Sequence, residues 1–189
     1  MKSDIRTIGI DDVAFCRETD KTTYIFGVVV RGSHIVEGIV QTRVTIDGLD
    51  ATERISEMIK TSKYYGQLKA IFFASSTIAA FNIVEVPLLY ELTQIPIIIL
   101  LHKLPDEKKT ERALAHFIDG KKRMSILKAN PPYCSITFKN KQKRMCKGFV
   151  QYFGIDKKSV STLLSITSYM SCVPECLRIA DLIGRSFRK

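Results

Sequence analysis

Residues 35–46 alternate between two kinds of side chain, and this alternation constrains the fold more than any other feature. The even-numbered positions are mainly β-branched, whereas the odd-numbered positions include Glu37, Gln41 and Arg43. A period of two predicts a long β-strand with one covered face. The β-branched segment 24–30 precedes it, and the Arg-Gly-Ser sequence between the two segments is typical of a hairpin turn. We therefore expect two antiparallel strands.

The rest of the chain extends this hairpin into a mixed α/β pattern. Residues 5–10 form a further apolar strand, which completes a three-strand meander. The continuous apolar run at 95–101 is typical of a parallel strand that is covered on both faces. The other expected elements are helices over 50–66, 86–93, 106–118, 159–167 and 174–187, a strand over 68–73, and short strands or loops over 133–138 and 145–152.

This order of elements predicts one α/β domain over residues 1–189, since 189 residues is an ordinary domain length. An antiparallel three-strand meander, continued by parallel strands and flanked by helices, describes the ribonuclease H-like sheet. Other mixed α/β folds fit the same pattern. No apolar run approaches the ~18 residues of a membrane span, and the first residues lack the apolar core of a secretory signal. We expect a cytoplasmic protein without membrane contact.

Cysteine and histidine provide no recognisable site. The five cysteines are odd in number and include no C-x-x-C pair, which favours reduced, buried thiols over disulfides or zinc ligands. The three histidines share no motif, and no Gly-x-Ser-x-Gly or Walker-type sequence occurs. We therefore expect neither a serine nucleophile nor a nucleotide cofactor. No pattern in the sequence indicates an oligomeric state.

Positive charge is concentrated in one part of the chain. Residues 1–100 hold 10 Lys+Arg against 12 Asp+Glu, whereas residues 101–189 hold 19 against 7. Residues 120–158 contain 11 basic residues, one acid and several interleaved aromatic residues. Such a stretch predicts binding to DNA or RNA, through phosphate contacts and stacking on unpaired bases. The alternative is a solvated face whose aromatic rings belong to the core. The basic residues expected to contact nucleic acid are Lys121, Lys122, Arg123, Lys139, Lys141, Lys143, Arg144 and Lys147.

Acidic residues follow several of the predicted strands. Asp11 and Asp12 come after the first, Asp47 after the third, and Glu85 past the fourth. Active sites of α/β sheets lie at strand ends, where a divalent cation offsets the repulsion between converging carboxylates. Oxygen ligands favour Mg²⁺ or Mn²⁺, which activate water for phosphodiester cleavage. We predict Asp11 and Asp47 as catalytic residues and metal ligands, with Asp12 as a third ligand. The alternative is that such acids form turns and helix caps, as expected for Asp50.

Four motifs occur in the order expected for a known family. They are Gly9-Ile10-Asp11-Asp12, the eleven-residue run Thr42–Thr52, Phe81–Glu85 and Pro174–Ala180. Together they resemble an archaeal family, the domain of unknown function numbered ninety-nine, which is related to endonuclease V. The run from Thr42 is specific, and the motifs extend over nearly the whole chain. The resemblance implies a ribonuclease H-like fold and a metal-dependent nucleic-acid site. In that site Asp11 matches the first metal ligand of endonuclease V, and Asp47 is the nearest candidate for the second.

One residue departs from the pattern of that family. Ala74 stands where the relatives have an aspartate, and alanine cannot bind a metal. Asp181, at a position where the relatives tend to have histidine, or Glu85 is a candidate replacement. The favoured function is metal-dependent nucleic-acid processing, with endonuclease V-like phosphodiester hydrolysis. The alternatives are an inactive nucleic-acid-binding protein on the same fold, which Ala74 favours, and a protein-interaction module, which would leave the basic stretch without a polyanion.

Overall fold

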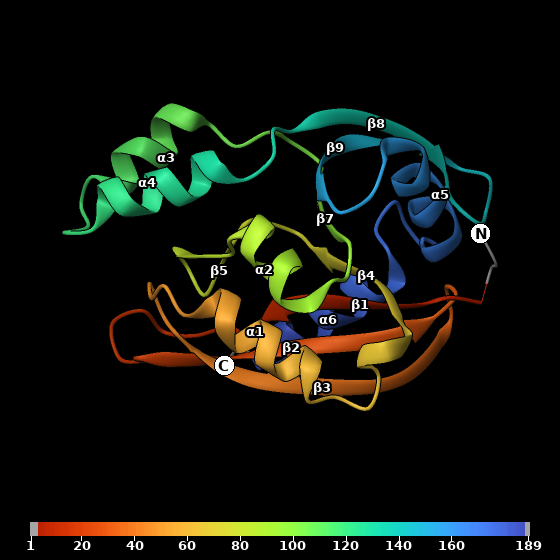
Figure 1. Ribbon diagram of the computed structural model, residues 1–189, viewed down its shortest axis with the longest axis horizontal. Helices are drawn as coiled ribbons and strands as arrows, with labels where there is room; N and C mark the ends of the chain where they lie inside the picture. The colour runs from red at the N-terminus through yellow and green to blue at the C-terminus, as the bar shows by residue number, and fades with distance from the viewer. Residues whose placement is uncertain (1–3, 188–189) are drawn as a thin grey trace.

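A computed structural model describes residues 4–187, and within them a seven-stranded mixed sheet runs in the order β3-β2-β1-β4-β7-β9-β8 (Figure 1). Its strands are β1 (Arg6–Asp12), β2 (Thr22–Arg31), β3 (Ile35–Thr45), β4 (Leu68–Phe73), β7 (Ile97–Leu101), β8 (Cys134–Lys139) and β9 (Met145–Phe153). A separate small hairpin consists of β5 (Thr77–Ile78) and β6 (Asn82–Ile83).

The meander predicted from the alternating segment is confirmed. Strand β2 pairs antiparallel with both β1 and β3. Strand β4 then pairs parallel with β1, and β7 pairs parallel with β4. The segments expected as short strands or loops are β8 and β9, which extend the far edge in antiparallel pairing. The carboxyl ends of β1 and β4 therefore lie side by side in the middle of the sheet.

Helices cover both faces of the sheet (Figure 1). They are α1 (Ala51–Lys60), α2 (Val86–Thr93), α3 (Glu107–Leu114), α4 (Gly120–Ala129), α5 (Lys157–Thr167) and α6 (Glu175–Ser186), with a 3-10 turn at Tyr65–Gln67. Ile71 and Phe73 of β4 pack with α1 and α2, whereas Phe72 packs with α5 and α6. All three are almost completely buried, which explains why the central strands are continuously apolar. Over residues 4–187, no helix is long and apolar enough to cross a membrane.

The expectation of a single helix over 106–118 is wrong. Helix α3 ends at Leu114, and α4 begins at Gly120 inside the basic stretch. A Cβ atom at Gly120 would lie 2.1 Å from the carbonyl oxygen of Leu114, so only glycine fits this tight reversal. The two helices pack together as a hairpin that projects from the sheet (Figure 1).

The expectation that all thiols are reduced is wrong for one pair of cysteines. A disulfide joins Cys146 of β9 to Cys172, which precedes α6. The two cysteines are 26 residues apart. The side-chain amide of Asn140 donates to the carbonyl oxygens of Tyr169 and Ser171, which holds the segment before Cys172 against the turn that leads to Cys146. Cys16, Cys134 and Cys176 are free.

Candidate active site

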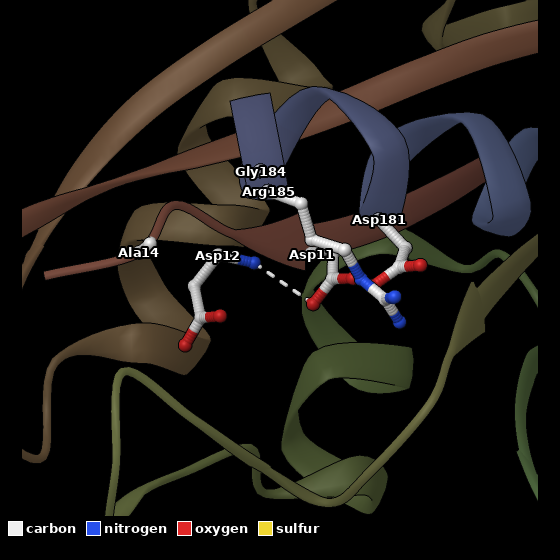
Figure 2. Close-up of a pocket in the computed structure, with 6 residues that line it drawn as sticks. All are labelled: Asp11, Asp12, Ala14, Asp181, Gly184 and Arg185. Carbon is white, nitrogen blue, oxygen red and sulfur yellow. Dashed lines mark hydrogen bonds and ion pairs between the residues drawn. The ribbon is translucent and has the colours of Figure 1, made fainter. Parts of the chain in front are cut away.

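The end of β1 places two adjacent carboxylates at the edge of the sheet. Figure 2 shows the Asp11 carboxylate beside Asp181 and Arg185 of α6, while the Asp12 carboxylate points away from them. This divergence follows from the strand, in which successive side chains point to opposite faces. The backbone amide of Asp12 donates to Oδ1 of Asp11 at 3.0 Å, and the amide of Ala79 donates to Oδ2 of Asp12. One oxygen of each carboxylate is thus held by the backbone.

Two glycines allow α6 to lie directly against β1. A Cβ atom at Gly9 would lie 2.2 Å from the backbone nitrogen of Leu177. A Cβ atom at Gly184 would likewise lie 2.2 Å from the carbonyl oxygen of Asp12. Because neither position carries a side chain, the last turns of α6 reach the end of β1, and their polar residues reach Asp11.

A cavity of about 380 Å³ opens beside these carboxylates. We call it the acid cavity; its lining residues are Asp11, Asp12, Ala14, Asp181, Gly184 and Arg185. Nε of Arg185 donates to Oδ1 of Asp181 at 2.7 Å. Among the described residues that line it, three carboxylates therefore share one guanidinium, which leaves an excess of negative charge.

This surrounding changes the ionisation of Asp11. Burial, and then the negative charge of Asp12, raises the pKa of Asp11 from 3.8 to about 7. The charge of Asp181 also raises this pKa, whereas the Asp12 amide and Arg185 lower it. Burial raises the pKa of Asp12 as well, although the hydrogen bond from Ala79 opposes the shift. A nearby cation would stabilise the ionised forms of these carboxylates.

The donor set of the acid cavity fits a hard divalent cation. Its ligating groups are carboxylate oxygens, which Mg²⁺ and Mn²⁺ prefer. Mg²⁺ usually binds through one or two carboxylates and keeps several waters. Within residues 4–187, no group of three or more His, Cys, Asp or Glu side chains is arranged to hold a metal. A cation at Asp11 and Asp181 would therefore complete its coordination with water and phosphate oxygens.

Asp47 is engaged elsewhere. Its Oδ1 accepts a hydrogen bond from the amide of Phe81 at 3.0 Å, and its Oδ2 accepts one from Nε of Arg17 at 2.8 Å. Its φ of 55° is the left-handed conformation that aspartate tolerates in turns. Over the described chain, the lining of the acid cavity does not include Asp47. The expected convergence of Asp11 and Asp47 on one metal ion is therefore not seen.

The other strand-end residues also have distinct places. Of the two candidates to replace the missing carboxylate, Asp181 lines the acid cavity, whereas Glu85 lies at the start of α2. Ala74 directly follows β4 and offers only a methyl group. Asp50 occupies the N-cap position of α1 as predicted, but its carboxylate accepts from the amide of Thr45 instead of from the helix.

Comparison with known proteins gives the family. The family model described as Endonuclease dU matches residues 3–188. The chain belongs to the Endonuclease dU family. The UPF0215 protein of Methanosarcina acetivorans is 39% identical over 185 residues, which cover 97% of this chain and 91% of the relative. The UPF0215 protein of Methanocaldococcus jannaschii is 35% identical, with coverage of 99% and 96%. The predicted relation to an archaeal family is confirmed.

Solved structures similar to this Endonuclease dU family member show its fold. A protein of unknown function from Archaeoglobus fulgidus has a TM-score of 0.82 at 27% identity, and the match covers 95% of this chain and 96% of that one. Endonuclease V of Bacillus subtilis has a TM-score of 0.61 at 14% identity, with coverage of 95% and 78%. Ciona intestinalis Endonuclease V, in complex with a 24mer DNA containing an inosine followed by a ribo-adenosine, has a TM-score of 0.58 at 12% identity, with coverage of 97% and 85%. The predicted ribonuclease H-like fold is confirmed, and family and fold together support a nuclease-like role.

The basic residues predicted to bind nucleic acid lie in two regions instead of one. Lys121 and Lys122 are exposed on α4. The other exposed members surround the turn between β8 and β9; they are Lys139, Lys141, Lys143, Arg144 and Lys147. Figure 1 shows α4 and this turn at opposite ends of the molecule. The interleaved Phe138 belongs to the core, as the alternative interpretation expected.

Arg123 has a different role from the one predicted. It is only 4% exposed. Its guanidinium donates to the Asp119 carboxylate and to the carbonyl oxygens of Asp47, Gly48 and Phe81, at 2.6–3.0 Å. The structure therefore corrects the prediction that Arg123 contacts phosphate. Its donors instead bind α4 to the turn after β3 and to Phe81.

Sequence reasoning did not identify Arg185 or Gly184 as part of the site. A signal was present, because Asp181 and Arg185 have the i,i+4 spacing of a helical ion pair and Gly184 lies between them. The sequence did not show which face of this helix meets β1, and that packing brings the pair to Asp11.

Proposed function

We propose that this protein is a divalent-metal-dependent endonuclease that hydrolyses phosphodiester bonds in DNA or RNA. The observation that carries the proposal is the acid cavity, where Asp11 has a pKa raised to about 7 beside two further carboxylates. A nucleic-acid phosphate would add negative charge to this cavity, so binding requires a cation. The family description makes a deoxyuridine-containing strand the first substrate to test. Inosine-containing DNA, the ligand of Ciona Endonuclease V, is the second.

Asp11 and Asp181 are the proposed ligands of Mg²⁺ or Mn²⁺, with Asp12 next to them. The bound ion would supply Lewis-acid stabilisation and a water of lowered pKa. Asp11 must be ionised to act as a ligand, so protons compete with the metal near pH 7. The exposed guanidinium of Arg185 offers donors to a phosphate oxygen. Lys121, Lys122 and the β8–β9 turn would add salt-dependent affinity for the backbone.

A second candidate is a protein that binds nucleic acid without cutting it. Ala74 favours this candidate, because an alanine stands where a metal ligand is expected. Ala74 follows Phe73, the β4 partner of Ile10, just as Asp11 follows Ile10. A carboxylate at position 74 would therefore adjoin Asp11 and add a ligand to the cavity. In the endonuclease, Asp181 would replace the missing carboxylate as a metal ligand. In the protein that only binds, it would not.

The test incubates the protein with labelled single- and double-stranded DNA and RNA, with and without deoxyuridine or inosine, in the presence and absence of Mn²⁺. We expect Mn²⁺-dependent cutting that falls about 100-fold or more in Asp11→Asn, because the first ligand of the metal is weakened. The matched control is Glu91→Gln, an exposed position on α2, and it should cut like the wild type.

The other outcomes are equally decisive. Binding to every strand without cutting supports the second candidate. A protein that binds no strand even at low salt contradicts both candidates and leaves the protein-interaction module. Cutting that survives unchanged in Asp11→Asn excludes the acid cavity as the active site.

A further inference from the structure

A row of aromatic rings begins next to Asp11, on the face of the sheet that α6 covers. Phe26 of β2 is the direct pairing partner of Asp11, and opposite residues of an antiparallel pair project from the same face. The Phe26 ring stacks with that of Tyr24, with centroids 6.3 Å apart and 11° between planes. It also stacks with Phe187, which follows α6, at 5.8 Å and 29°. We call these three rings the aromatic row.

The aromatic row lies outside the core. Tyr24 is 38% exposed and Phe187 is 54% exposed. In the part of the chain that the structure describes, none of the three rings belongs to either buried cluster. Phe26, between Tyr24 and Phe187, is half-buried. Single exposed aromatic side chains are ordinary, but aromatic rings that contact one another at the surface are typical of a site that binds a partner. Its place beside the acid cavity connects it with whatever enters that cavity.

A cationic group flanks one end of the row. Arg43 is the β3 partner of Tyr24, and its guanidinium lies 4.5 Å from the Tyr24 ring centroid. A second guanidinium, that of Arg185, lines the neighbouring acid cavity, where it pairs with Asp181. Flat rings bordered by a guanidinium group match a ligand with planar apolar faces and anionic links between them. An uncharged peptide would offer the Arg43 guanidinium no anionic partner, whereas a nucleic-acid strand offers it a phosphate, so the chemistry favours a nucleic-acid strand.

We propose that the aromatic row is a stacking site for unpaired bases next to the phosphate that enters the acid cavity. This inference rests on the proposed function and specifies its substrate as a strand with unpaired bases near the cleaved bond. Every base has a π-face, so stacking here tolerates sequence. Paired bases are already stacked within a duplex and leave these rings unfilled. The site therefore selects single-stranded or locally opened nucleic acid.

The test measures binding of the full chain with Ca²⁺ in place of Mn²⁺, which keeps a hard, oxygen-binding cation available to the acid cavity. A gel of the same samples checks that the probes remain uncut. One probe is a labelled thymidine oligonucleotide, and the second is the same strand with central abasic residues, which keep the phosphates and lack the bases. We expect Tyr24→Thr to bind the thymidine strand roughly tenfold more weakly, and Tyr24→Phe to bind it like the wild type. The abasic strand should bind the wild type and Tyr24→Thr equally.

The matched control is Ile39→Thr, because Ile39 is an apolar side chain of β3 that is 52% exposed. It should leave both affinities unchanged. Equal losses on the two probes in Tyr24→Thr would overturn the stacking site, since the variant would then act through the fold or the charge. Unchanged binding of the thymidine strand by Tyr24→Thr would also overturn it and leave the proposed function standing. A wild type that binds neither probe contradicts the proposed function itself, and the stacking site with it.

Discussion

The loop at residues 79–81 contacts two groups of charged side chains that are built in opposite ways. At its start, a backbone amide donates to Asp12 of the acid cavity. At its end, the amide of Phe81 donates to Asp47, and the carbonyl oxygen of Phe81 accepts from Arg123. We call this second group the Arg123 cluster; its charged members are Arg123, Asp119, Asp47 and Arg17.

The difference between the two groups is their balance of charge. In the Arg123 cluster, Arg123 meets Asp119 at 2.7 Å and Arg17 meets Asp47 at 2.6 Å, so cations and anions are equal in number across the described residues. The acid cavity, counted over the same residues, holds three aspartates and one arginine. A balanced cluster stabilises the loops that it joins, whereas an unbalanced one is stabilised when a cation binds to it. The same residue types at neighbouring strand ends thus form a charge-balanced contact between loops in one place and leave an excess of negative charge in the other.

The largest expected effect on stability comes from breaking the balanced group. In Arg123→Met the carbonyl oxygens of Asp47, Gly48 and Phe81 lose their donor in a buried place. We expect the free energy of unfolding to fall by about 3 kcal/mol. Urea denaturation measures this change, with Lys122→Met at the neighbouring exposed position as the control, expected within ~0.5 kcal/mol of wild type. If the two variants unfold alike, Arg123 does not anchor α4.

Removing a charge from the acid cavity should have the opposite effect and raise the free energy of unfolding. The raised pKa of Asp11 contributes stability that is fully present below pH 3.8 and is lost as the pH rises through about 7. Asn resembles the neutral acid at every pH. In EDTA we therefore expect Asp11→Asn to be more stable than wild type by roughly 2 kcal/mol near pH 8, and little different near pH 4.

Urea unfolding at the two pH values measures this divergence. Glu91→Gln, on the exposed surface of α2, is the control and should follow the wild type at both. An Asp11→Asn variant that loses stability equally at both pH values would show that the ionised carboxylate is not destabilised in the metal-free fold, and the contrast with the Arg123 cluster would fail.

Local sequence pattern predicted most of the sheet, because strand periodicity and apolar runs are properties of the segment itself. The alternation over β3 and the apolar run that contains β7 are examples. Helix α4 was not predicted, and its composition explains why. Arg123 is the buried residue that this helix contributes over its described length, so no apolar stripe marks it. Its position depends on hydrogen bonds to a turn more than 70 residues away in the chain.

The site was predictable only in part for the same reason. Asp11 was identified because it ends a strand, which is a local feature. Asp181 remained an alternative, because its approach to Asp11 depends on Gly9 and Gly184 at the contact between α6 and β1. Asp47 also closely follows a strand, but its carboxylate binds Arg17, which is 30 residues away. A strand-end acid becomes a ligand or a turn residue according to partners that local pattern does not reveal.

The smallest expected effect distinguishes these two roles for Asp47. Asn tolerates the left-handed conformation at position 47 and keeps an acceptor for the Phe81 amide, so Asp47→Asn loses mainly the half-exposed ion pair with Arg17. We expect a loss of about 0.5–1 kcal/mol in the free energy of unfolding. Arg17→Met removes the same ion pair from its other side and should cost a similar amount, while both variants keep Mn²⁺-dependent cutting. A different result would change this assignment: cutting that falls in Asp47→Asn as far as in Asp11→Asn, but survives in Arg17→Met. The carboxylate of Asp47 must then move to the metal when substrate binds. The Arg123 cluster would in that case be part of the active site.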